Sequence, residues 1–265
     1  MSHRFAASIL ASVGLVAGCW LLAPAVRRLP LVPDTAELIR LCGPFRGLPI
    51  PFAWQALNRA KSRYNPTRVV AAGQWLARLM PERKDLFSGF AYDIAYSAGP
   101  LENDPRRRAS RVAEAVALLE LGLRLHPQAA DLPARAAFIL THKTETDPDL
   151  AQSFRQHYGD PLALAVGYMG QASTLWPTVD WYRWQRANLL QQNALQELRA
   201  GDRTSAARML ADAAERFAPI RAERSARLGE LAAALSPGGV LTPTLRSWLT
   251  SDWLMSRHPE LWHRD

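Results

Sequence analysis

Histidine, cysteine and acidic side chains are the residues of this chain that could bind a metal or catalyse a reaction. None of the six histidines lies three or four residues from another, the spacing at which one helix face directs two imidazoles at a zinc ion. Two cysteines, Cys19 and Cys42, are too few for a cysteine zinc site or a disulfide scaffold. Neither a GxxxxGK[ST] nor a GxGxxG phosphate-binding motif is present. We therefore predict a non-enzymatic protein without cofactor or metal.

Basic side chains are the second chemical feature. The 265 residues hold 32 Lys+Arg and 24 Asp+Glu, a net charge of +8, and only three of the basic residues are lysines. They are spread along the chain rather than gathered in a stripe, so nucleic-acid binding is not expected. Two local groups predict a basic patch that meets anionic lipid or an acidic partner, with a solvated face as the alternative. They are Arg106, Arg107, Arg108, Arg111 and Arg221, Arg224, Arg227.

One long apolar run predicts a membrane anchor. Residues 5–26 (FAASILASVGLVAGCWLLAPAV) carry no charge and lie between Arg4 and the pair Arg27-Arg28. As a helix, the run would span the roughly 30 Å hydrocarbon core of a bilayer. Two alternatives remain, a cleaved signal peptide and a lipoprotein signal. Val16-Ala17-Gly18-Cys19 resembles a bacterial lipobox, in which Cys19 would be acylated, although the run stays apolar beyond it.

The side of the membrane is left open by the charges around this run. Arg27, Arg28, Arg40 and Arg46 outnumber Arg4, which favours a cytoplasmic domain. A short basic start before an apolar run is also typical of exported, uncleaved anchors. We expect a single-pass protein of the bacterial inner membrane with a slight preference for the cytoplasmic face.

The sequence that follows the predicted anchor is expected to be helical throughout. A capping residue precedes proline at Asn65-Pro66, Asp104-Pro105, Asp147-Pro148, Asp160-Pro161 and Thr242-Pro243. Such pairs are typical of helix starts, because the side chain accepts from first-turn N–H groups and proline fits the first position. No run alternates long enough to predict a strand. The predicted helices are 34–42, 51–63, 66–80, 84–98, 105–126, 130–143, 148–157, 161–175 (buried and central), 178–199, 203–217, 219–235 and 242–257.

A spacing recurs in two of these helices. Ala115, Leu119, Gly122 and Pro127 are separated by four, three and five residues, and so are Ala207, Ala211, Ala214 and Pro219. Small residues on one face let a helix pack closely against its neighbour. The spacing resembles the second helix of a tetratricopeptide repeat. The first-helix pattern is weaker at Trp54, Phe87 and Trp184, and chance spacing in an irregular helical bundle is the alternative.

The resemblance implies about three degenerate tetratricopeptide-like hairpins, at 51–81, 84–127 and 178–219, with an insertion around Gly99–Arg107. The segment 44–98 is also similar to a group of membrane-anchored bacterial helical-repeat proteins. It carries the similarity through Pro44-Phe45-Arg46-Gly47-Leu48, Trp54, Arg63-Tyr64, Leu79-Met80-Pro81, Phe87 and Phe90-Ala91-Tyr92-Asp93-Ile94-Ala95-Tyr96. This group implies an architecture and no chemistry.

The predicted organisation is an all-α chain whose first helices line a partner-binding groove. The domains are the anchor with its flanks (1–28), a Pro-rich stem and short helix (29–50), a tetratricopeptide-like α-solenoid (51–235), and a linker, capping helix and tail (236–265). Candidate partner-binding residues are Gln55, Asn58, Arg59, Arg183, Arg186, Asn188 and Gln191. We expect a scaffold or assembly factor that binds membrane or envelope proteins. The alternatives are an accessory subunit of a larger membrane complex, or an enzyme whose site forms only in the folded groove.

Overall fold

The computed structural model describes residues 49–240 and 242–244. These residues form an all-helical fold in which no strand occurs. The elements are α3 (Pro49–Ser62), α4 (Pro66–Leu79), α5 (Lys84–Tyr92), the π-helix η2 (Asp93–Ala98), the 3-10 helix η3 (Gly99–Leu101), α6 (Pro105–Leu125), α7 (Asp131–Thr146), α8 (Pro148–Tyr158), α9 (Pro161–Leu175), α10 (Asp180–Ala200), α11 (Arg203–Phe217) and α12 (Ala222–Leu235).

Several predictions concern the remaining residues. The anchor at 5–26, Cys19, Cys42, the helix at 34–42 and nearly all of the capping helix at 242–257 lie outside the described part of the chain. Among the helices that are described, none combines the length and the apolar character needed to cross a bilayer.

Helix starts follow the capping pattern. Asn65, Asp104, Asp147 and Asp160 each accept a hydrogen bond from an N–H of the first turn, and each is followed by proline. Asp202 caps α11 in the same way without a proline, accepting from the Ser205 N–H at 2.9 Å. The four predicted caps that fall within described helices are therefore confirmed. The helix boundaries agree with the predictions to within three residues, except at the end of α5.

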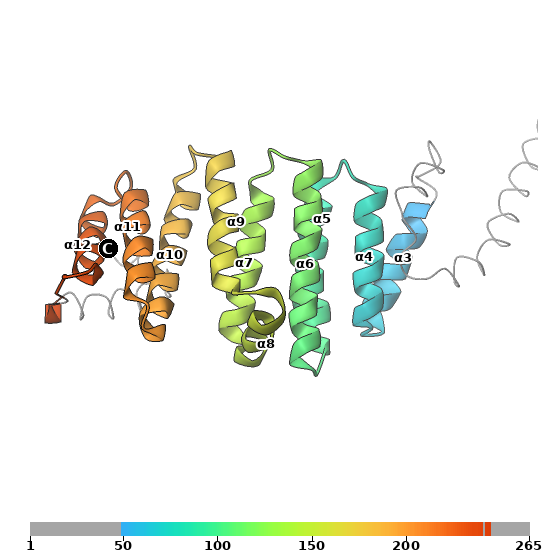
Figure 1. Cartoon of the computed structure of the whole chain (residues 1–265). Helices are drawn as coiled ribbons and strands as arrows, with labels where there is room; N and C mark the ends of the chain where they lie inside the picture. The colour runs from blue at the N-terminus through green and yellow to red at the C-terminus, as the bar shows by residue number, and fades with distance from the viewer. Residues whose placement is uncertain (1–48, 241, 245–265) are drawn as a thin grey trace, which may run out of the picture.

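The helices stand side by side in chain order, from α3 at one end to α12 at the other (Figure 1). Consecutive helices pack against each other from α3 to α7, and again from α9 to α12. Helix α8 departs from this order, because it packs on α6 and α7 while α9 takes the place beside α7. The three predicted hairpins correspond to the packed pairs α3–α4, α5–α6 and α10–α11.

The core is continuous along the row. One cluster of buried apolar side chains runs from α3 to α10, and a second runs from α10 to α12. Helix α10 joins the two, since Leu189 belongs to the first cluster and Ala187 and Leu190 belong to the second. Each helix is thus buried by its neighbours in the row, as expected for an array that has no single centre.

Close helix contact occurs at the small residues of the repeated spacing. A Cβ placed on Gly122 would lie 2.8 Å from Phe87 Cγ and 3.1 Å from Leu132 Cδ1. Ala115, Ala207 and Ala214 are also buried, whereas Ala211 is exposed. The absence of a side chain at Gly122 therefore lets α6 approach Phe87 of α5 directly.

Two details differ from the predictions. The helix predicted over 84–98 is α-helical only to Tyr92 and continues as the π-helix η2, a change of hydrogen bonding that apolar spacing does not reveal. The helix predicted as buried, α9, lies between α7 and α10 but keeps one face exposed, including Leu164 and Gly167. The lack of charge in α9 predicted a buried central helix, and the structure shows that it is only partly buried.

Candidate partner-binding surface

An exposed aromatic cluster joins η2 to α7. The rings of Tyr92 and Tyr96 stack with centroids 4.3 Å apart, and those of Phe138 and His142 stack at 5.5 Å. Tyr96 and His142 link the two pairs at 5.4 Å, and Lys143 places its Nζ 5.1 Å from the Tyr96 ring centroid. We call these five side chains the aromatic surface. Tyr92 is 46% exposed and Phe138 is 44% exposed, so the outer rings of both pairs face solvent.

The helices position these rings by a simple periodicity. Tyr92 and Tyr96 are four residues apart at the junction of α5 and η2, and Phe138 and His142 are four apart in α7. Residues at this spacing lie one above the other on a helix face. Helices α5 and α7 pack against each other, which brings the two aromatic pairs together. Single-turn π-helices are frequent at functional sites, and η2 carries Tyr96.

The polar atoms of the aromatic surface are held by their neighbours. Tyr96 Oη and His142 Nδ1 form a hydrogen bond of 3.1 Å. Burial raises the pKa of Tyr96 to about 12, reinforced by Tyr92 and opposed by Arg135. Burial likewise lowers the pKa of the Lys143 ammonium, an effect that Asp147 opposes and Arg108 reinforces. The surface therefore presents apolar ring faces beside a partly desolvated cation.

Such an arrangement is suited to binding another chain. Exposed aromatic rings supply large contact areas at low conformational entropy, and they are enriched where proteins bind each other. Trp54 of α3 extends the same type of side chain towards α5, with its ring centroid 5.6 Å from that of Phe90. A partner segment with apolar side chains and a carboxylate would match the rings and Lys143.

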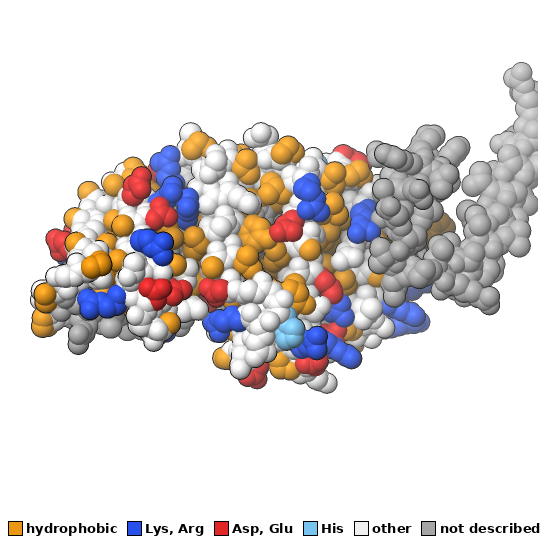
Figure 2. Space-filling view, viewed as in Figure 1, with side chains coloured by type: hydrophobic (Ala, Val, Ile, Leu, Met, Phe, Trp, Pro, Cys, Tyr) orange, Lys and Arg blue, Asp and Glu red, His pale blue; other side chains and the backbone are white. Residues whose placement is uncertain are grey.

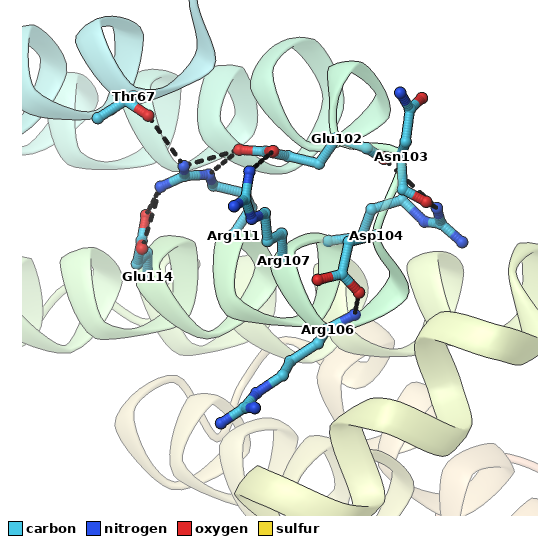
Figure 3. Close-up of polar contacts among 9 residues, drawn as sticks. Thr67, Glu102, Asn103, Asp104, Arg106, Arg107, Arg111 and Glu114 are labelled. Atoms are coloured by element: carbon cyan, nitrogen blue, oxygen red, sulfur yellow. Dashed lines mark hydrogen bonds and ion pairs between the residues drawn. The ribbon is translucent and has the colours of Figure 1, made fainter.

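The first predicted basic group lies at the start of α6. Arg107 and Arg111 pair there with Glu102 (Figure 3), and Arg108 pairs with Asp147. Arg111 donates to Glu102 at 2.7 Å, to Glu114 at 2.9 Å and to Thr67 Oγ1 of α4 at 3.3 Å. Burial acts to lower the Arg111 pKa, but the hydrogen bonds to Glu102 and Glu114 outweigh it and raise that pKa. This group therefore joins α4, the segment before α6, and α6 itself.

Arg108 makes a second connection of the same kind. Its Nε donates to Asp147 at 2.7 Å, while its Nη1 donates to the backbone carbonyl of Asn103 at 3.0 Å. Burial acts to raise the Asp147 pKa, but hydrogen bonds from the Leu150 N–H and Arg108 lower it overall. Arg107 lies 3.9 Å from Glu102, and both Arg106 and Arg107 are exposed. Only these last two remain directed at solvent.

The predicted partner-binding residues divide into two sets. Gln55, Asn58 and Arg59 are exposed together on α3, where Arg59 donates to Gln55 at 3.4 Å. In α10, Arg183 donates to Asp180 and to the carbonyl of Pro177.

Three further α10 residues lie within the packing. Arg186 lies against Gly170 of α9 and 3.6 Å from Asp212 of α11. Asn188 and Gln191 are buried, and Gln191 accepts a hydrogen bond from Arg224 at 2.7 Å. Arg186 therefore contacts α9 and α11, and Gln191 contacts α12, all within the same chain.

The second basic group does not form a uniform stripe. Arg221 and Arg227 are exposed, and Arg227 donates to Glu223 at 2.6 Å. Arg224 is buried, with its guanidinium 4.6 Å from the centroid of the Phe217 ring. Figure 2 shows both signs of charge interspersed over the face it presents.

A shallow groove lies between α11 and α12. Its volume is about 470 Å³. Alanines form half of the lining, and Arg208 is the only charged residue there. No group of three or more histidine, cysteine or acidic side chains that could hold a metal occurs among residues 49–240 and 242–244. The groove therefore has few side chains that could catalyse a reaction or bind a charged ligand.

Sequence reasoning missed the aromatic surface. The repeated spacing of four between Tyr92 and Tyr96 and between Phe138 and His142 was available as a signal. Aromatic residues at helical spacing usually belong to the core, however, and only the tertiary structure reveals that these rings remain exposed. When the chain is compared with protein-family models and with curated proteins, it matches none of them.

Proposed function

We propose that the chain is a non-enzymatic scaffold or assembly factor that binds a protein partner through the aromatic surface. One observation carries this proposal: two stacked ring pairs, one at the α5–η2 junction and one on α7, meet at a tilted contact between Tyr96 and His142, while Tyr92 and Phe138 stay nearly half-exposed. Rings that are already ordered lose little further entropy when a partner covers them. They can therefore act as anchors of a binding site.

The architecture is consistent with this role. We propose that α3–α4, α5–α6 and α10–α11 are degenerate tetratricopeptide-like hairpins of an α-solenoid, with α3, α5 and α10 as first helices. The burial of Ala115, Gly122, Ala207 and Ala214 supports the proposal, because these are the small residues of the recurring spacing. Helix α7 packs beside α5 and so continues the row of first helices. Such a row is the usual binding face of a helical-repeat protein.

The sequence adds a membrane anchor to the proposal. Residues 5–26 would tether the helical array to a bilayer, which we propose to be the bacterial inner membrane. The partner would then be a membrane or envelope protein. A carboxylate on the partner would meet Lys143 and the exposed Arg135 beside the rings.

Site-directed photo-crosslinking in native membranes tests this function. A benzophenone amino acid replaces Phe138 on the aromatic surface or, as a matched control, the similarly exposed Tyr158 at the end of α8. We expect one defined crosslinked product from position 138 and none of that mass from position 158. The combined substitution Tyr92→Ser and His142→Ser should abolish the product. An identical pattern from both positions, or a product that survives the substitutions, would contradict the proposal.

A second candidate role is that of a permanently bound accessory subunit. The exposed face of α9 favours it, because it carries no charge; its residues are Leu164, Gly167, Gln171 and Thr174. A helix of another subunit could pack there as α7 and α10 pack on the other faces of α9. Replacement of Leu164 and Gly167 by glutamate should then release the protein from a stable complex. A transient scaffold would be unaffected by that change.

A further inference from the structure

Exposed tryptophans gather at one edge of the helical array. Trp176 follows the last residue of α9, and Trp181 is the second residue of α10. They are 42% and 49% exposed, and Leu125 at the end of α6 is 47% exposed. Tryptophan is mostly buried in folded proteins, so two half-exposed indoles in neighbouring segments indicate a surface with a specific use.

Contacts place these side chains on a common edge. The starts of α5 and α7 are joined by Lys84 and Asp131, whose Nζ and Oδ1 atoms are 3.1 Å apart. Tyr182 at the start of α10 lies near both residues, because both affect its hydroxyl group. Burial and the Asp131 carboxylate raise the pKa of Tyr182, and the Lys84 ammonium opposes this increase. The Tyr182 ring centroid is 6.3 Å from that of Trp176 and 5.3 Å from that of Trp181. The two indoles therefore flank the meeting point of three helix ends.

The same edge is where the described chain begins. In Figure 1 the connections α4–α5, α6–α7, α9–α10 and α11–α12 all lie along the upper edge, and α3 starts there. The predicted anchor ends at residue 26, which leaves residues 27–48 between it and the described structure. Such a length of chain spans at most about 80 Å when fully extended. A tether that enters at this edge gives it the shortest path to the bilayer and so favours it over the opposite edge.

Charge at the edge is largely neutralised within the chain. Lys84 pairs with Asp131, Arg83 donates to Asp85 at 2.7 Å, and Arg183 donates to Asp180. An edge with paired charges repels or attracts lipid headgroups less strongly than an edge with unpaired charges of one sign. The indoles can then act in the way that is general at membrane–water interfaces, with the ring in the headgroup region and its N–H bonded to water or lipid.

We infer that this edge rests on the surface of a lipid bilayer, with Trp176 and Trp181 at the level of the headgroups. The inference rests on the proposed membrane anchor. Because the tether holds the array at a high local concentration next to the lipid, even weak insertion of two indoles orients it. The helices then stand upright on the membrane. The aromatic surface faces sideways along the bilayer, towards neighbouring membrane proteins.

Depth measurements on the full-length chain in vesicles test the orientation. In a background with Cys19→Ser and Cys42→Ser, an environment-sensitive dye is attached at Thr178→Cys, between the two indoles. The matched control carries the dye at Asn103→Cys, an exposed site between η3 and α6 at the opposite edge. Nitroxide-labelled lipid should quench the dye at position 178 several-fold more than at position 103. Trp176→Ser with Trp181→Ser should reduce that quenching towards the control value.

The outcomes separate the two proposals. Flotation of the vesicles at alkaline pH first reports whether the chain is anchored. If it floats but positions 178 and 103 are quenched alike, the anchor stands and the edge contact is overturned. If it does not float, the anchor is overturned, and the edge contact that depends on it is overturned as well. The inference is also contradicted if quenching at position 178 is unchanged by the tryptophan substitutions, provided that the circular dichroism of the variants is unchanged.

Discussion

Gly122 offers the sharpest test of how the helices pack. Replacing Gly122 by alanine would place a Cβ 2.8 Å from Phe87 Cγ, 2.9 Å from Phe87 Cβ and 3.1 Å from Leu132 Cδ1. Atoms in real structures do not approach so closely, so either α6 or its neighbours must move. Phe87 and Leu132 have no exposed surface, and neither can turn its side chain towards solvent. The substitution therefore forces α5 and α6 apart.

The magnitude follows from two opposing effects. Overpacking a well-packed core costs about 1–3 kcal/mol. Alanine in a helix interior is favoured over glycine by about 1 kcal/mol. Because two atoms of the buried Phe87 side chain, Cβ and Cγ, are contacted below 3 Å, we expect the packing effect to prevail. The free energy of unfolding should fall by about 1–2 kcal/mol, which corresponds to a decrease in melting temperature of about 5 °C for a domain of this size.

A matched control has the opposite sign. Gly167 lies in the middle of α9, and a Cβ there would meet no atom within 4 Å. Gly167→Ala should raise the free energy of unfolding by about 0.5–1 kcal/mol through helix propensity alone. Thermal unfolding of the full-length chain in detergent, followed by far-ultraviolet circular dichroism, compares both variants with the wild type. A Gly122→Ala chain at least as stable as the wild type, or a destabilised Gly167→Ala chain, would refute the reasoning.

Three further predictions concern polar contacts. Because the Asp147 pKa is lowered in the folded chain, its contribution to stability is complete above the ordinary value of 3.8 and is lost as the pH falls through the folded value. Asp147→Asn, whose amide oxygen can still cap α8, should remove this acid dependence and lower stability at pH 7 by about 1 kcal/mol in denaturant unfolding. Arg111→Met leaves the buried Glu102 carboxylate without its main partner and should reduce the unfolding free energy by about 3 kcal/mol. The added change Glu102→Gln should recover part of this loss in a double-mutant cycle, and an additive result would contradict a direct interaction. With its pKa raised from 10.0 to about 12, Tyr96 contributes stability that is complete below pH 10 and lost as the pH rises towards 12. Tyr96→Phe should abolish that alkaline loss in urea melts at pH 9 and pH 11.

Local signals determined most of the secondary structure. Asn65, Asp104, Asp147 and Asp160 were readable as helix starts because capping involves only residues two or three positions away. The spacing around Gly122 likewise predicted a close contact between successive helices. In contrast, the π-helical turn at Asp93–Ala98 left no mark in the apolar pattern, and the uncharged α9 proved to be only partly buried. Neither property is decided by neighbours along the chain.

The surroundings of the predicted basic and partner-binding residues depended on tertiary contacts. Arg108 and Arg111 looked like a free basic cluster, but Asp147, far along the chain, and Glu102 and Glu114, on adjoining turns, bind them once the helices pack. Asn188 and Gln191 were assigned to a surface and are instead buried.

The sequence by itself determined that the described part of the chain is all-helical, most of its helix boundaries and the small residues at which helices approach. These follow from hydrogen bonds and spacings within a few residues, which every helix satisfies locally. Tertiary structure alone decided which polar groups form ion pairs, which aromatic rings stay exposed and which helix ends share an edge. The physical reason is that burial and electrostatic pairing depend on the whole set of neighbours in space, and those neighbours come from segments that are far apart in the chain.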